Sequence, residues 1–194
     1  KGKLATLEDI QKFKDTGRYN NDWNLTYAII TYYLAILMRK LQQRQVLKGF
    51  IKRFSEIHFS EVRSFIKTLG EVGEFCGRHG IGATELASMK NDSALGLESW
   101  LTRAKGENNV FPEIALTQIL PKDGSEKLML IKKLVPYNLK EPDPLKRLFE
   151  ECYLGEKLFS KFYGLTPMFN FGESFLEKEE FIPKRKTLDT LLLK

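Results

Sequence analysis

The chain has 194 residues, 42% hydrophobic and 29% charged, and its 31 Lys and Arg against 25 Asp and Glu give a formal net charge of +6. This composition is typical of a globular protein and excludes a disordered one. Two cysteines, Cys76 and Cys152, are too few for a secreted disulfide scaffold. We therefore expect a folded intracellular protein, from cytoplasm or nucleus, whose modest positive charge favours anionic partners.

The two ends of the sequence resemble cut points in a longer parent protein. The chain begins Lys1-Gly2-Lys3 without Met, ends on Leu191-Leu192-Leu193, and has no apolar run in residues 1–20 that could be a signal peptide. Residues 23–38 carry no charge, but this run is shorter than the roughly 20 apolar residues of a membrane span. We expect a buried core helix there and no membrane partner.

The first half of the chain shows helix signals. Thr6 and Asp9 have the spacing of a capping box, which predicts a helix over 6–15. Asp22 can cap a long central helix that starts at Trp23 and runs to about Ile57, with a kink near Gly49. Further helices are expected after residues 60, 84 and 93. The residues expected in the core are Ile29, Ile30, Leu34, Leu37 and Phe65.

In the second half the pattern changes to short apolar runs, 113–120 and 127–131, on either side of Asp123-Gly124. Asp-Gly is a strong turn dipeptide, so this region predicts a β-hairpin. Asp143-Pro144 predicts the start of a helix that continues to Gly164. The expected fold class is α+β, mostly α: a helical core on a long central helix, plus one hairpin. We expect a helical subdomain over 1–106 and a hairpin-plus-helix subdomain over 107–194.

The clearest functional signal is basic. Residues 23–55 contain no Asp or Glu. Four cations there, which we call the basic stripe, follow one another at intervals of four residues and would share one face of a continuous helix for about 18 Å: Lys40, Arg44, Lys48 and Lys52. Like charges at this spacing repel, and phosphates of DNA or RNA would offset the repulsion. The stripe and the adjacent Arg53 are therefore candidate anion-binding residues; the alternative is a solvated face.

Residues 72–89 also have the spacing of a helix-turn-helix, with Gly80 in the turn. The hairpin would then be the wing of a winged helix, with Lys122 and Lys127 near its tip as further candidate binding residues. Gly77 in the first helix and Glu85 in the second argue against this interpretation, and the alternative is a helical corner closed by glycines.

The sequence shows no catalytic signature. Cys76 and His79 have the spacing of half a zinc site, but only His58 and Cys152 could complete it, so we expect no metal and no cofactor. Nucleophile-elbow, P-loop and dinucleotide patterns do not occur. Three interpretations stay open: a non-enzymatic module that binds DNA or RNA through a basic helix face, a domain that binds another protein or the rest of its parent chain, and an enzyme of unrecognised type.

Overall fold

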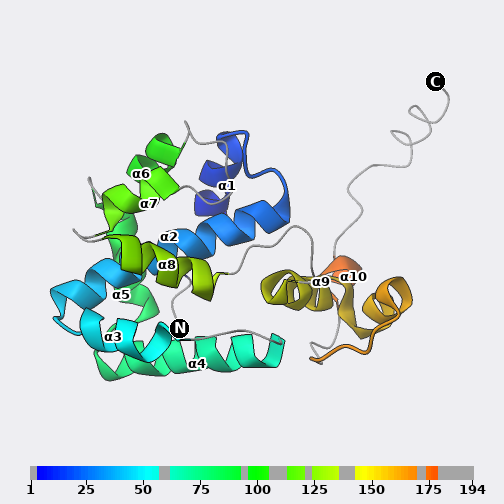
Figure 1. Cartoon of the computed structure of the whole chain (residues 1–194). Coiled ribbons are helices and arrows are strands. Elements are labelled where there is room, and N and C mark those ends of the chain that lie inside the picture. The colour runs from blue at the N-terminus through cyan, green and yellow to red at the C-terminus, as the bar shows by residue number, and fades with distance from the viewer. Residues whose placement is uncertain are drawn as a thin grey trace. The chain divides into compact units, whose positions relative to one another are not determined.

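The computed structural model describes residues 4–56, 62–92, 96–104, 113–120, 124–135, 143–169 and 174–178, and all regular secondary structure in these ranges is helical (Figure 1). The chain divides into two compact units, Lys1–Leu145 and Lys146–Lys194. The subdomain boundary expected between 106 and 107 stays a prediction, which folding measurements on the separate parts would test.

The first unit is built around helix α2 (Asp22–Gln43). Every residue from Thr31 to Met38 is buried, and because eight residues make more than two turns, all sides of the helix are covered. The side chain of Asn21, one residue earlier than expected, caps the helix by accepting a hydrogen bond from the Trp23 N–H at 2.9 Å. Among the described residues, no helix combines the length and apolarity needed to cross a membrane.

Helices from the whole first unit cover α2. Five of them contact it directly: α1 (Leu7–Asp15), α3 (Leu47–Phe54), α5 (Ala83–Ser88), α7 (Glu113–Ile119) and α8 (Gly124–Leu134). Helix α6 (Leu97–Ala104) packs on α1, on α7 and on the short 3₁₀ helix η1 (Met89–Asn91). Helix α4 (Val62–Arg78) packs on α3 through Phe75, whose ring centroid lies 5.4 Å from that of Phe50 and 6.1 Å from that of Phe54.

Much of the helical pattern predicted for the first half is confirmed. The capping box of α1 forms, since the Asp9 N–H donates to Thr6 Oγ1 at 3.2 Å and the Thr6 N–H to the Asp9 carboxylate at 2.7 Å. Of the expected core residues, Leu34, Leu37 and Phe65 are buried, whereas Ile29 and Ile30 are only partly buried against the core.

The predicted β-hairpin is wrong. Its two expected strands fall on helices α7 and α8, and the described part of the chain contains no strand, so the fold class is all-α rather than α+β. Their buried residues follow a helical period: Leu116, Ile119 and Leu120 in the first run, and Lys127, Leu130, Ile131 and Leu134 in the second. Gly124 begins α8 instead of lying in a hairpin turn. Asp is favoured both directly before a helix and in a turn, so the dipeptide did not discriminate between the two.

The long helix predicted to run to Ile57 is also divided, at Gln45 rather than Gly49. Helix α2 ends in a Schellman motif, in which the Val46 N–H donates to the Leu41 carbonyl at 3.0 Å and the Gln45 N–H to the Gln42 carbonyl at 2.9 Å. This motif requires a left-handed residue, and Gln45 has φ 61°. Helix α3 then starts at Leu47 in a new direction (Figure 1).

Helix α9 (Pro144–Tyr163), whose residues from 146 onward belong to the second unit, is interrupted at Gly155. There φ is 69° and ψ is 173°, a conformation that only glycine adopts readily. A Cβ at this position would lie 2.8 Å from the Ser174 Cβ, next to α10 (Phe175–Lys178). The helix begins as predicted, with the Leu145 N–H donating to the Asp143 carboxylate at 2.9 Å.

A buried carboxylate holds the chain after α9 in place. Glu151 accepts hydrogen bonds from the N–H groups of Met168 and Phe169 at 2.8 and 3.1 Å, and from Arg147 Nε at 2.9 Å. Because its charge is matched by these donors, Glu151 can be almost fully buried without the penalty of an isolated ion.

The Leu34→Ala substitution should lower the free energy of unfolding by about 2–5 kcal/mol, because the surrounding helices cannot close over the lost side chain. Urea titration monitored by circular dichroism measures this, with Leu7→Ala as control because the Leu7 side chain is 85% exposed. A loss under about 0.5 kcal/mol for Leu34→Ala would place α2 on the surface and contradict the architecture.

Gln45→Gly should stabilise the protein by roughly 0.5–1 kcal/mol, because glycine adopts the left-handed conformation without steric cost. The same substitution two residues earlier, Gln43→Gly, lies in the last turn of α2 and should destabilise by up to about 1 kcal/mol. Thermal unfolding of both variants checks the opposite signs. Destabilisation of similar size in both would mean that α2 does not end in this motif.

Candidate functional site

The basic stripe does not lie on one helix. Lys40 is in the last turn of α2, Arg44 is the C-cap residue, and Lys48 and Lys52 lie on α3. The left-handed residue between Arg44 and Lys48 changes the chain direction, so the continuous face expected over 18 Å does not exist. The stripe instead consists of two pairs of cations.

Lys40 and Arg44 form an internal ion cluster with Glu85 of α5. Lys40 Nζ lies 2.7 Å and an Arg44 guanidinium nitrogen 3.2 Å from the same carboxylate oxygen, Glu85 Oε1. The hydrogen bond from Lys40, together with that from Arg44, holds the pKa of Glu85 below its ordinary value despite the opposing effect of partial burial. Half of the stripe is therefore partly neutralised within the protein.

Lys48 and Lys52, which we call the α3 lysine pair, are exposed, and no described residue forms an ion pair or hydrogen bond with either. They are four residues apart on a helix whose opposite side, with Phe50 and Phe54, is buried in the core. The neighbouring Arg53 lies within 3.7 Å of Glu71 of α4 and 5.5 Å from the centroid of the Phe54 ring, so it is engaged. The lysine pair is thus a cationic surface on a firmly anchored helix.

Lys122 and Lys127 were expected near the tip of a wing that depended on the predicted hairpin. Lys127 is buried in α8 and takes part in an interaction within the chain, and Lys122 lies outside the described residues. Because the expected hairpin is helical, the wing is excluded. A hairpin tip would have exposed Lys127, whereas the helical period of α8 turns it inward.

Residues 72–89 do form two helices joined by a glycine turn. Helix α4 ends in a Schellman motif, with Gly80 at φ 69° and the Ile81 N–H donating to the Cys76 carbonyl at 2.9 Å. The second helix, α5, is only six residues long and contains no Lys or Arg. Its one acid, Glu85, is bonded to Lys40 and Arg44, so α5 offers no basic side chain for reading a DNA groove.

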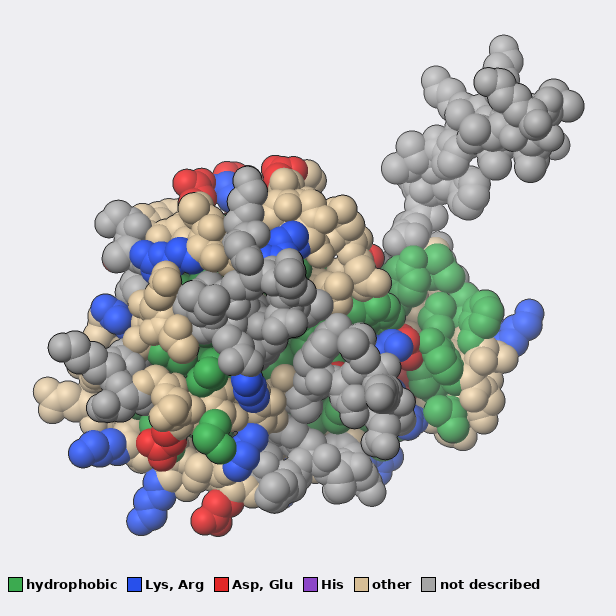
Figure 2. Space-filling model, turned by 45° about the horizontal axis from the view of Figure 1, so that its top comes forward, with side chains coloured by type: hydrophobic (Ala, Val, Ile, Leu, Met, Phe, Trp, Pro, Cys, Tyr) green, Lys and Arg blue, Asp and Glu red, His purple; other side chains and the backbone are tan. Residues whose placement is uncertain are grey.

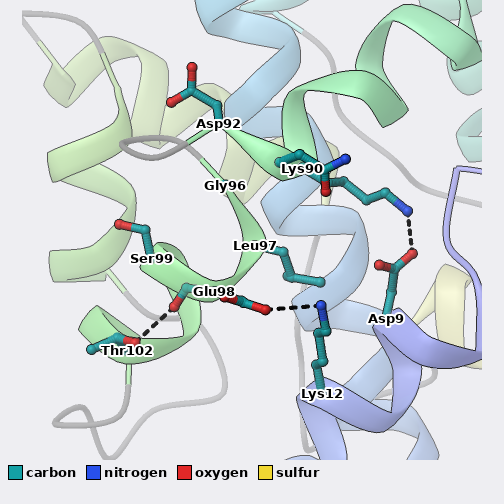
Figure 3. Close-up of a pocket in the computed structure, with 10 residues that line it drawn as sticks. Asp9, Lys12, Lys90, Asp92, Gly96, Leu97, Glu98, Ser99 and Thr102 are labelled. Atoms are coloured by element: carbon teal, nitrogen blue, oxygen red, sulfur yellow. Dashed lines mark hydrogen bonds and ion pairs between the residues drawn. The ribbon is translucent and has the colours of Figure 1, made fainter.

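A polar pocket of about 440 Å³ lies between α1, η1 and the start of α6 (Figure 3). Two ion pairs dominate its lining. Lys90 Nζ lies 2.6 Å from the Asp9 carboxylate, and Lys12 Nζ 3.0 Å from that of Glu98. Sequence analysis missed this pocket because these pairs join residues 81 and 86 positions apart, a separation that no local spacing rule detects.

The ionisation of these groups does not suit acid–base catalysis. Burial raises the pKa of Asp9, but the Lys90 ammonium and the Thr6 N–H and hydroxyl outweigh it, and the net pKa is lowered. The hydrogen bonds from Lys12 to Glu98 and Glu8 raise the pKa of Lys12. Both shifts favour the charged forms, whereas a general acid or base needs a pKa near neutrality. The pocket therefore supports ion pairing rather than the enzyme interpretation.

Metal binding has no support in the described residues, which contain no group of three or more His, Cys, Asp or Glu placed to hold an ion. Burial raises the pKa of the Cys76 thiol to about 11, which disfavours the thiolate that zinc requires. His79 packs against the Phe75 ring, with centroids 4.6 Å apart. Of the other residues considered, Cys152 lies in the second unit and His58 lies outside the described residues.

The lowered pKa of Asp9 predicts how the free energy of unfolding depends on pH. A carboxylate with a lowered native pKa stabilises the fold above its unfolded value, about 3.8, and loses this contribution as pH falls through the lower native value. Asp9→Asn should therefore cost about 1–3 kcal/mol at pH 7, because Lys90 loses its partner, and less as the pH falls below 4. Urea unfolding from pH 7 to pH 3 measures this, with the exposed acid of the same helix, Asp15→Asn, as control. A difference between Asp9→Asn and wild type that is constant over this range would contradict it.

Comparison with known proteins gave no match to this chain, whether with protein-family models, with curated proteins or with solved structures.

Proposed function

We propose that this chain is a non-enzymatic binding module that contacts nucleic-acid phosphates through the α3 lysine pair. The observation that carries the proposal is the exposure of Lys48 and Lys52 on one side of α3, with no described acid to neutralise them. By contrast, Arg39 of α2 and Lys133 of α8 form hydrogen bonds within the protein. Arg39 donates to the Ile119 carbonyl at the end of α7, at 3.2 Å, and Lys133 to the Ser55 carbonyl at the C-cap of α3.

The geometry of the lysine pair suits a phosphate backbone. Four residues of helix separate the two lysines by about 6 Å along the axis. One strand of duplex DNA carries a phosphate every 3.4 Å or so of axis, so the two ammonium groups can engage phosphates about two steps apart. Burial of Phe50 and Phe54 fixes α3 in place, so binding need not order the helix first.

Such a surface should bind with little sequence preference and strong salt dependence, because lysine–phosphate contacts release counterions without reading bases. The Lys48→Ala/Lys52→Ala variant should weaken binding to all sequences alike. It should also lower the slope of log affinity against log salt by about 2 if both side chains touch phosphate. Fluorescence titration of labelled DNA and RNA at several salt concentrations measures both effects.

The control is Lys157→Ala/Lys161→Ala, which removes the same two charges at the same spacing from an exposed part of α9. An equal effect of the two double variants would assign the binding to net charge alone. Absence of binding by wild type at low salt, or an unchanged slope in Lys48→Ala/Lys52→Ala, would overturn the proposal.

A protein-binding function is the alternative that a specific observation favours. Hydrophobic side chains gather on the surface of the second unit (Figure 2). Phe162 and Phe175 of this unit are 68% and 63% exposed. Phe159 is the one large apolar side chain fully buried among the described residues of this unit. With so little core among its described residues, this unit would gain stability from a covering surface. A discrete oligomer or complex, free of nucleic acid after nuclease treatment, would favour this function.

A further inference from the structure

We propose that the Glu85 carboxylate occupies a second phosphate site, formed by Lys40 and Arg44, and that a bound nucleic acid displaces it. This inference rests on the proposed function and extends the phosphate-binding surface beyond the α3 lysine pair. It makes Glu85 an internal competitor of the ligand, so the affinity of the wild-type protein is set partly by its own acidic side chain.

The geometry of the cluster is that of an anion site. Lys40 and Arg44, one helical turn apart at the C-terminus of α2, both reach Glu85 Oε1, at 2.7 and 3.2 Å. One carboxylate charge faces two cations, so the site keeps a net positive charge. A phosphate carries several acceptor oxygens and could use the planar donor array of Arg44 more completely than a single carboxylate oxygen does.

The cluster is accessible from solvent. The side chain of Arg44 is 50% exposed, and those of Glu85 and Lys40 are 25% and 20% exposed. Because Arg44 is half-exposed, water and salt screen its ion pair with Glu85, and a ligand of higher charge could replace this pair. A phosphate approaching from solvent would meet Arg44 first.

Helix α5, which carries Glu85, is weakly held. It has six residues, none of them buried. Its N-cap residue is Gly82, which has no side chain to accept a hydrogen bond from the first turn. A helix this short has little stability of its own, so its position depends on contacts such as the Glu85 ion pairs. Because none of the six residues is buried, withdrawal of Glu85 from Lys40 and Arg44 takes no buried side chain out of the core.

The test is the titration of labelled DNA and RNA with Glu85→Gln, which removes the competing charge and keeps the shape of the side chain. Affinity at low salt should rise about fivefold or more. The slope of log affinity against log salt should steepen by about 1–2, because one or two further cations reach phosphate. Adding Arg44→Ala to Glu85→Gln should remove most of this gain.

The matched control is Glu98→Gln, which makes the same change in net charge at a glutamate bonded to Lys12 instead of to the stripe. If Glu85→Gln and Glu98→Gln change affinity and slope equally, the Glu85 inference is overturned. The proposed function then still stands, provided that Lys48→Ala/Lys52→Ala weakens binding. If neither wild type nor Glu85→Gln binds at low salt, both proposals fail.

Discussion

The burial of helix α2 is the constraint on which the first unit depends. The helix is apolar on all sides over its central turns, so it cannot lie at the edge of a domain with one side in water. Five other helices contact it, drawn from positions between residues 7 and 134. These helices surround α2 on all sides and do not pack on one face of it. Each therefore covers only part of its surface, and helices of only six to eight residues can do this.

The covering helices are held by charges as well as by apolar contacts. Lys40 and Arg44 hold α5 through Glu85, Arg39 joins α2 to the end of α7, and Lys133 joins α8 to the end of α3. These four cations are thus bonded to a carboxylate or to a carbonyl at a helix C-terminus, where a positive charge is favourable. Within the basic stripe, Lys48 and Lys52 are the two cations that form no ion pair with a described residue.

The polar pocket beside α1 shows the same use of charge. Asp9 is a member of the α1 capping box and is also the partner of Lys90, so one carboxylate fixes a helix start and joins it to a segment 81 residues away. A site for proton transfer needs a group whose pKa lies near neutrality, whereas the pKa of Asp9 is lowered and that of Lys12 is raised, so both charged forms are favoured. The pocket is therefore better explained as part of the fold than as a catalytic centre.

Elements whose causes are local could be predicted from the sequence. The capping box of Thr6 and Asp9, the cap at Asp143 and the glycine turn at Gly80 follow from interactions within a few residues, and each is present. The central helix is present where the uncharged apolar run of residues 23–38 predicts it. Tertiary structure alone decided the rest. The left-handed turn at Gln45 carries no glycine signal, and short apolar runs such as 113–120 fit a strand or a helix until the surface that buries them is known. The pairing of Glu85 with Lys40 and Arg44 joins segments 41 or more residues apart, so a list of basic residues could not show which of them remain free.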